Sequence, residues 1–313
     1  MILEAPYSGS DNLQPAVSAI SARQGQSPPP SEYVFDNRSE LAATRYRELS
    51  ALYDAQTIRH LERRGIDEGW SCLEVGAGGG SIASWLCRRV GDTGHVLATD
   101  IEPRFLQMLS FPNLEVRRHD IRIDGLPNGQ FDLAHARLLL MHLPGREVAL
   151  ERMIAALKPG GWLVIEEFDG LSILANSTVN PGEEDLKLLR ACYQVLIARG
   201  VEMRYGRALP QLLRAHGLVN LGAEASVSLW RGCSPGTKLF KLNFEELADP
   251  IVRAGLMTEA EFEADMKRLE EGDFLMLSPL MWTVWAQVPE WLSEPESKSV
   301  VFDHPQVIVE ARR

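Results

Sequence analysis

The segment EVGAGGGS, residues 74–81, decides the fold of this chain. A short apolar run ending at Leu73 precedes it, and apolar residues at helical spacing follow it over 82–90. The next strand-like run, 95–99, leads into Asp100. In such a strand–turn–helix–strand unit, glycines let the backbone pass close to a ligand and the second strand's terminal carboxylate holds a ribose diol. The segment therefore predicts a nucleoside site.

Composition limits the partners of the chain. With 313 residues, 45% hydrophobic and 24% charged, it is typical of a soluble globular protein. A net charge of −11 argues against nucleic acid or an anionic membrane as a partner. No apolar run has the length of a membrane span and no secretory pattern opens the chain, so we expect a cytoplasmic enzyme. The four cysteines lie far apart without metal-binding spacing, which predicts buried thiols and no metal site.

Strands and helices alternate after residue 70. The pattern predicts strands over 95–99, 114–119, 131–136 and 162–167, helices over 81–90, 103–109 and 146–157, and a turn at 158–161. Alternation of this kind predicts a mostly parallel sheet covered on both faces, with ligands at the carboxyl ends of its strands. Further on, helices are expected over 183–199, 207–217 and 240–271, and strands over 223–230 and 275–287. The helical segment between the last two strands predicts a lid over the carboxyl edge of the sheet.

These patterns divide the chain into five expected parts. They are an arm (1–30), an N-terminal helical cap with a helix over 39–64 (31–69), the nucleoside-binding core (70–170), the lid helices with the last sheet strands (171–288), and a tail (289–313). The arm is rich in Ser, Gln, Gly and Pro, which is typical of disorder. Its length leaves open that a partner subunit orders it, which would make the protein a homodimer.

Five short motifs follow one another in a recognisable order. They are LEVGAGGG (73–80), TD (99–100), HD (119–120), FDLAHAR (131–137) and LKPGG (157–161). In this order they resemble the class I S-adenosylmethionine-dependent methyltransferases, most closely the bacterial small-molecule enzymes of natural-product pathways. The resemblance implies an α/β fold with a Rossmann-like, mostly parallel sheet of seven strands, a helical lid insertion and an N-terminal helical extension. It also implies S-adenosyl-L-methionine as cofactor and S-adenosyl-L-homocysteine as product.

The glycine spacing separates this cofactor from a dinucleotide. A dinucleotide site needs G-x-G-x-x-G or Ala, and here Ser81 stands at the last position while the third glycine is Gly80. S-adenosylmethionine has no pyrophosphate to place at a helix N-terminus, and its positively charged groups favour a carboxylate such as Glu74. We therefore favour S-adenosylmethionine.

The resemblance also implies a set of cofactor-binding residues. They are Tyr33, Gln56, Glu74, Gly76, Gly78, Gly80, Asp100, Ile101, Asp120, Ile121, Ala136 and Arg137. The glycines would line the methionine part, Asp100 would accept the ribose hydroxyls, and Asp120 with Ile121 would meet the adenine. Ala136 and Arg137 would close the site through their backbones. Tyr33 and Gln56 are included for their positions before and on the first helix, and ordinary packing is the better explanation of both. Capping of a turn is the alternative for Asp120.

Methyl transfer mainly requires alignment of the nucleophile and exclusion of water. A base is needed only where the acceptor loses a proton, and His142, just after the fourth strand, is the leading candidate. Packing explains His142 equally well. Glu167 and Asp169, at the end of the fifth strand, are second candidates, with solvated carboxylates as the alternative. Four late aromatic residues suit a flat or isoprenoid acceptor, although core packing also accounts for them: Tyr205, Trp230, Trp282 and Trp285.

The sequence thus predicts an enzyme of class EC 2.1.1 that transfers a methyl group to O, N or C of a small, secondary-metabolite-like acceptor. The alternative is an S-adenosylmethionine-binding cyclase of the same fold that transfers no methyl group. A non-catalytic binding protein is disfavoured, because the acidic chain shows no DNA-binding helix pair. Neither the acceptor nor its methylated atom follows from the residues, because fold alone does not fix function.

Overall fold

A seven-stranded sheet forms the centre of the protein. The computed structural model describes residues 35, 37, 41–174 and 186–293, so the expected arm, Tyr33 and all but the first residues of the tail lie outside the described residues. The strand order is β3-β2-β1-β4-β5-β9-β6, and only β9 runs antiparallel to its neighbours. The strands are β1 Ser71–Val75, β2 His95–Asp100, β3 Leu114–Arg118, β4 Phe131–Arg137, β5 Leu157–Asp169, β6 Val219–Ser226 and β9 Leu280–Gln287. The expected mostly parallel sheet of seven strands is confirmed.

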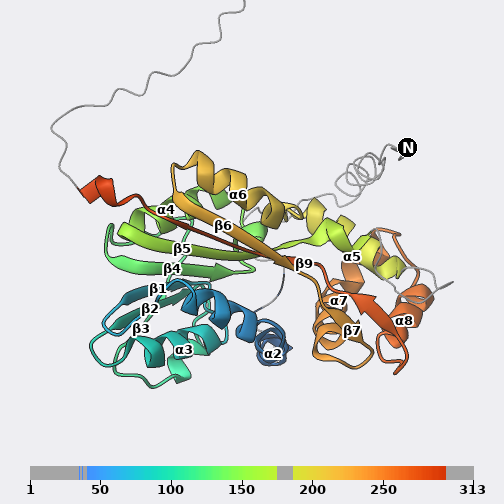
Figure 1. The fold of residues 1–313 in the computed structure, drawn as a ribbon. Coiled ribbons are helices and arrows are strands. Elements are labelled where there is room, and N and C mark those ends of the chain that lie inside the picture. The colour runs from blue at the N-terminus through green and yellow to red at the C-terminus, as the bar shows by residue number, and fades with distance from the viewer. Residues whose placement is uncertain (1–34, 36, 38–40, 175–185, 294–313) are drawn as a thin grey trace, which may run out of the picture.

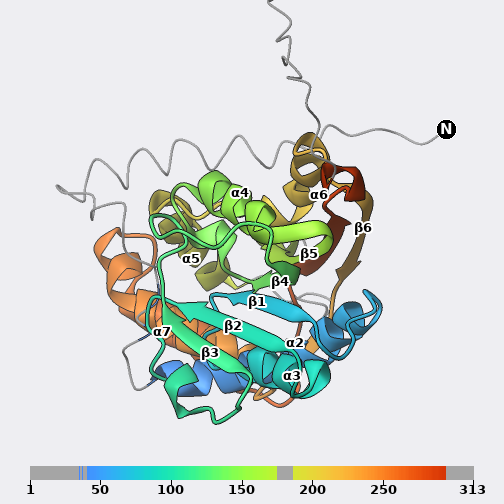
Figure 2. The ribbon, with the colours of Figure 1, turned by 90° about the vertical axis from the view of Figure 1, so that its left-hand side faces the viewer.

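Helices cover both faces of this sheet. The helices α4 (Arg146–Ala156) and α6 (Tyr205–Ala215) lie on one face, and α2 (Leu41–Glu62) and α3 (Ser81–Val90) lie on the other (Figures 1 and 2). The central strands are mainly apolar before their carboxyl ends, where Leu73, Leu163 and Ile165 are fully buried. A strand that is buried on both faces needs such a continuous apolar run. Cys72, Cys87 and Cys192 are buried thiols, whereas Cys233 is exposed.

The chain leaves the sheet between β6 and β9 to build a separate cap. This segment contains β7 (Leu229–Arg231), α7 (Pro235–Arg253), α8 (Glu259–Arg268) and β8 (Leu275–Leu277). The strands β7 and β8 pair with each other and not with the main sheet. Together with α5 (Lys187–Ala198), the cap lies beyond the carboxyl ends of the parallel strands, at the right of Figure 1.

Four expected elements differ from the observed ones. The strand expected over 223–230 is divided between β6, which ends at Ser226, and β7, which begins at Leu229 in a different sheet. The helix expected over 103–109 is only a 3₁₀ turn at Leu106–Met108, because so short a run seldom sustains an α-helix. The helix expected over 240–271 is two helices: α7 ends at Arg253, shortly before Gly255 with its φ of +69°, and α8 begins at Glu259 after the N-cap Thr258. The strand expected over 275–287 is broken at Pro279, since proline donates no hydrogen bond to a strand ladder.

The predicted turn at 158–161 lies inside β5. The strand already pairs with β4 at Leu157, and the register shifts before Trp162. Gly160, with φ of +77°, takes up the irregularity. The pairing of β1 with β4 places Glu74 beside His135. The pairing of β4 with β5 after the irregularity places Arg137 beside Glu166. Four ionisable side chains are therefore gathered at the carboxyl edge of the sheet.

Candidate active site

A single cavity runs along the carboxyl ends of β1, β2, β4 and β5. The glycine loop, Asp100 and Asp120 line one end of it. The other end, which we call the acceptor chamber, is lined by residues of α5 and α7 together with residues of β5 and of the segments that follow β5, α5 and β8: Phe168, Gly170, Cys192, Tyr193, Leu196, Met203, Leu239, Phe240, Asn243, Phe244 and Pro279. Residues from one side of α2 complete the wall: Arg45, Tyr46, Leu49 and Ser50.

The glycine loop is held in a form that only glycine adopts easily. The φ angles of Gly76, Gly78 and Gly80 are +68°, +50° and +78°. A Cβ on Gly78 would lie 2.7 Å from Cε1 of Tyr46, and one on Gly80 would lie 2.6 Å from Cδ1 of Leu109. Gly76 and Gly78 line the cavity, whereas Gly80 lies behind it and begins α3. The loop thus leaves room both for a ligand and for the ring of Tyr46.

Asp100 lies beneath this loop at the end of β2. Its side chain is buried, and its two oxygens accept hydrogen bonds of 2.9 Å from the backbone N–H groups of Gly78 and Glu102. Burial raises the pKa of the carboxyl group above its usual value, although the two hydrogen bonds oppose the shift. A carboxylate has about four acceptor positions, so positions remain for a ribose diol. The residue and its setting fit the ribose of S-adenosylmethionine.

The residues expected to meet the adenine line the cavity. Ile101 and Ile121 both line the cavity and offer apolar surface for a ring. The carboxylate of Asp120 is engaged by Arg122, which donates from Nε at 2.9 Å and from Nη2 at 2.7 Å. The hydrogen bonds from the Arg122 side chain lower the pKa of Asp120. Arg122 also lines the cavity. It was not predicted from the sequence, although its position two residues after Asp120 is a signal that could have identified it.

Glu74 belongs to a buried row of charges across three strands. His135 donates from Nδ1 to Glu74 Oε2 at 2.8 Å, and its Nε2 lies 3.5 Å from Glu166 Oε2, within ion-pair distance. Burial by itself would lower the pKa of His135, but Glu74 and Glu166 raise it to about 9. Burial likewise opposes ionisation of Glu166, but His135 and its other partners lower that pKa to about 2. Glu74 also lines the cavity, where its carboxylate suits a cationic amino group.

Arg137 ties α2 to the sheet through its side chain. It donates to Thr57 Oγ1 and to Asp54 Oδ1, each at 2.8 Å, and it lines the cavity. Ala136 is fully buried and does not line the cavity. Gln56 also lies away from the cavity lining, since its amide bonds Thr283 and Ser226 on the last strands. The structure therefore places neither Ala136 nor Gln56 where a ligand would be touched.

His142 follows β4 in the chain and is the candidate base in the lining of the cavity. It lines the cavity, and its ring meets that of Phe35 edge to face at 5.9 Å between centroids. Burial, together with the nearby Arg146 and Arg45, lowers its pKa to about 4. The imidazole is therefore neutral near pH 7 and is able to accept a proton.

The structure gives Glu167 a different place from the one expected. One carboxylate oxygen accepts from the backbone N–H groups of Leu139, Leu140 and Met141, at 3.1, 2.6 and 3.3 Å. The side chain is fully buried and does not line the cavity. Burial raises its pKa to about 8, against the effect of those hydrogen bonds. Glu167 thus holds the loop that carries His142, and Asp169, also outside the lining, pairs with Arg207.

The aromatic residues of the acceptor chamber are not those expected from the sequence. Tyr205, Trp230, Trp282 and Trp285 do not line the cavity. Trp230 packs edge to face on Phe240 at 4.9 Å, and Trp285 stacks against Arg64 at 4.2 Å. Four other rings contribute to the chamber instead: Phe168, Tyr193, Phe240 and Phe244.

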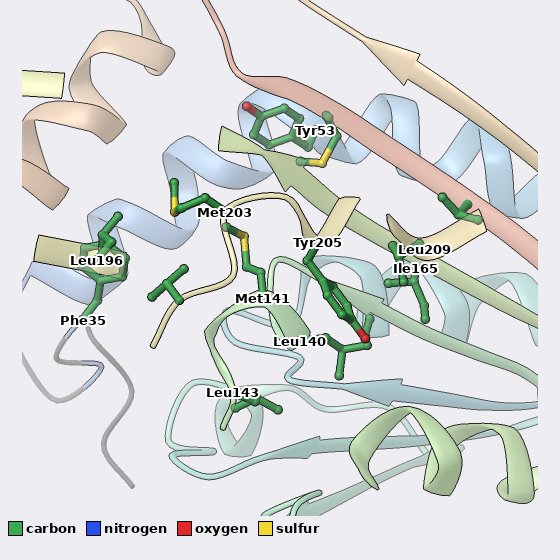
Figure 3. Packing of buried hydrophobic residues seen from close by; sticks show 14 of the residues in the cluster. Phe35, Tyr53, Leu140, Met141, Leu143, Ile165, Leu196, Met203, Tyr205 and Leu209 are labelled. Carbon is green, nitrogen blue, oxygen red and sulfur yellow. The ribbon is translucent and has the colours of Figure 1, made fainter. Parts of the chain in front are cut away.

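The apolar wall continues beyond these rings. Phe35, Met141, Leu196 and Met203 all line the cavity, and Figure 3 shows them within the same packed cluster. Among the described residues that line the cavity after position 167, none carries a charge. The chamber therefore favours an apolar molecule.

Neither a group of metal ligands nor a membrane-spanning helix is present among the described residues. In that part of the chain no three His, Cys, Asp or Glu side chains are grouped so that they could hold a metal ion. None of the helices described there has the length and apolar character to cross a membrane.

Comparison with known proteins shows the relatives of this chain. The model of the methyltransferase domain family matches residues 34–222. Methyltransferase str2 of Strobilurus tenacellus is 32% identical over 145 residues, which are 46% of this chain and 51% of str2. The ubiquinone/menaquinone biosynthesis C-methyltransferase UbiE of Enterobacter sp. (strain 638) is 27% identical over 151 residues, covering 42% of this chain and 60% of UbiE. The matched region thus spans about half the length of str2.

Solved structures show the same architecture. Phosphoethanolamine N-methyltransferase 2 of Haemonchus contortus, solved with S-adenosyl-L-methionine, superposes with a TM-score of 0.50 at 14% identity. The superposition covers 81% of this chain and 59% of that enzyme. At this level of identity the match concerns the fold alone.

Proposed function

Because this chain belongs to the methyltransferase domain family, as a class I S-adenosylmethionine-dependent enzyme, we propose that it methylates a small, largely apolar molecule. One observation carries the proposal: a single cavity joins the glycine loop and Asp100 to an apolar chamber, and His142 lines the same cavity. The name of UbiE, a C-methyltransferase of ubiquinone and menaquinone biosynthesis, supports an acceptor of this kind.

The residues at the glycine-loop end fit the cofactor group by group. We assign the ribose to Asp100, the adenine to the apolar surfaces of Ile101 and Ile121, and the cationic amino group to Glu74. Gly76 and Gly78 allow the backbone to approach the methionine part. When bound, S-adenosylmethionine supplies a methyl carbon that its sulfonium sulfur makes electrophilic.

The protein's own side chains orient the acceptor and accept its proton. The apolar chamber excludes water and orients the acceptor, which supplies most of what such a transfer needs. Where the acceptor atom carries a proton, neutral His142 accepts it. Glu167 keeps His142 in place by fixing the backbone from Leu139 to Met141.

The test is formation of S-adenosylhomocysteine. Purified protein is incubated with S-adenosylmethionine and a panel of phenols, quinols and aromatic amines, and the products are separated by mass spectrometry. We expect S-adenosylhomocysteine and a methylated acceptor in equal amounts. Tight binding of S-adenosylhomocysteine without any turnover over a broad panel would contradict methyl transfer and favour the cyclase alternative.

A further inference from the structure

One polar side chain of the acceptor chamber lacks a partner. Asn243 lies on α7 and lines the cavity, and its Oδ1 is shielded from solvent. No hydrogen-bond donor among the described residues reaches that oxygen. Buried polar atoms are nearly always paired, so an unpaired one that lines a cavity indicates a ligand group.

Most of the residues that line the chamber together with Asn243 are apolar. Leu239 and Phe240, four and three residues earlier, share its face of α7 and also line the chamber. The helix α5 lines the same chamber with Cys192, Tyr193 and Leu196. An amide in such surroundings gains most from a single, directed hydrogen bond.

We propose that Asn243 determines acceptor specificity, its amide oxygen accepting a hydrogen bond from a hydroxyl or amino group on an otherwise apolar, uncharged acceptor. The inference rests on the proposed function and goes beyond it, because it states which acceptors are selected. The group that Asn243 recognises is distinct from the atom that is methylated, because Asn243 lies on α7 in the chamber whereas the methyl donor is assigned to the glycine-loop end of the cavity. Sites built to hydrogen-bond a substrate group discriminate strongly against analogues that lack it.

The experiment compares two probes that differ by one hydroxyl group. 2,7-Dihydroxynaphthalene and 2-naphthol are titrated calorimetrically into the full chain saturated with S-adenosylhomocysteine. We expect the wild type to bind the diol about tenfold more tightly or better, the discrimination typical of one buried hydrogen bond. In Asn243→Leu, of similar volume, the preference should fall below about twofold.

Two controls exclude indirect effects. Glu245→Gln, on the exposed side of the same helix, should keep the wild-type preference. Asn243→Leu should melt no lower than the wild type, because it removes an unpaired buried oxygen, and should bind S-adenosylhomocysteine unchanged.

The outcomes separate the inference from the proposed function. A wild type without preference for the diol, or a preference that persists in Asn243→Leu, overturns the inference. The wild type is titrated with S-adenosylhomocysteine before the naphthols are added. Failure to bind S-adenosylhomocysteine in that titration overturns the proposed function as well.

Discussion

Asp100 has two tasks at the scale of a single residue. It fixes the glycine loop through Gly78, and its remaining acceptor positions are available to a ribose. The sequence predicted this residue because its position after a strand is visible without a structure. Asn243 was not predictable in this way, because what marks it is the hydrogen-bond partner that its amide oxygen lacks in space.

Asp100→Ala should weaken binding of S-adenosylhomocysteine about 100-fold or more, because two hydrogen bonds to a charged group are lost. Isothermal titration calorimetry measures the effect. Asp92→Ala, in an exposed turn, is the matched control and should bind as the wild type does. Unchanged affinity in Asp100→Ala would remove the basis for the ribose assignment.

His142→Gln should lower kcat for an acceptor with an O–H group about 100-fold and leave affinity for S-adenosylhomocysteine unchanged. Because the pKa of His142 is about 4, the imidazole is already neutral at pH 5 to 8, and kcat/KM should show no step near 6.5. A pH–rate profile checks this, with the exposed His216→Gln as control. A step near 6.5 that disappears in His142→Gln would mean that His142 is solvated.

At the scale of elements, the glycine loop and α2 are fitted to each other. Tyr46 of α2 lies on Gly78 and Gly79, and its ring is held edge to face by Phe105 at 5.5 Å. The sequence predicted the loop and the helix separately. It did not predict their contact, because helical spacing shows which face is apolar but not which loop that face meets.

Gly78→Ala should destabilise the protein by about 2–4 kcal/mol, since both the positive φ and the contact with Tyr46 resist a Cβ. In a Tyr46→Ala background the cost should fall to about 1 kcal/mol, the strain of φ alone. Urea denaturation measures both. Gly129→Ala is the matched control: its φ is +63° and a Cβ there meets nothing within 4 Å, so it should show the strain only. If Gly78→Ala lowers the free energy of unfolding by the same amount in the wild-type and the Tyr46→Ala backgrounds, the contact with Tyr46 does not cause the destabilisation.

His135 joins β1, β4 and β5 through the buried carboxylates on its two sides. His135→Gln should lower the free energy of unfolding at pH 6 by about 3–5 kcal/mol, because it leaves two buried carboxylates without their cation. The folded pKa is raised to about 9, so this stability is complete below about 6.5 and is lost as the pH rises through 9. The difference from the wild type should therefore shrink toward pH 9.

Denaturation at both pH values measures this difference, and the exposed His95→Gln should show no such trend. A difference that stays constant with pH would mean that His135 is neutral in the folded protein.

At the scale of the whole molecule, the cofactor half was predictable and the chamber was not. Short motifs mark the strand ends from β1 to β5, whereas the chamber joins α2, α5 and α7 from three distant parts of the chain. Large aromatic residues were expected there, yet Trp230 and Trp285 pack elsewhere. Burial favours many positions for an aromatic ring, so residue type alone does not say which of them faces a ligand.

Ligand binding should raise the stability of the whole protein. S-adenosylhomocysteine at about 100 times its Kd should add about 2.7 kcal/mol and raise Tm by several degrees. NAD at the same concentration should leave Tm unchanged, because the glycine spacing ending at Ser81 lacks the dinucleotide pattern. Differential scanning fluorimetry compares the two, and an equal shift with NAD would contradict the choice of cofactor.

The path of the cap segment has a consequence for how acceptor choice can change. β6 and β9 are hydrogen-bonded neighbours, and Ser226, the last residue of β6, pairs with Met281 near the start of β9. The sheet therefore requires only that the connecting segment, residues 227–279, begins and ends at the same place. It sets no requirement on the length or the sequence of that segment. Loop closure costs little more as a connection lengthens. The segment that carries Asn243 should therefore be exchangeable between relatives. Such an exchange should transfer part of the acceptor preference and leave the part of the protein that binds the methyl donor unchanged.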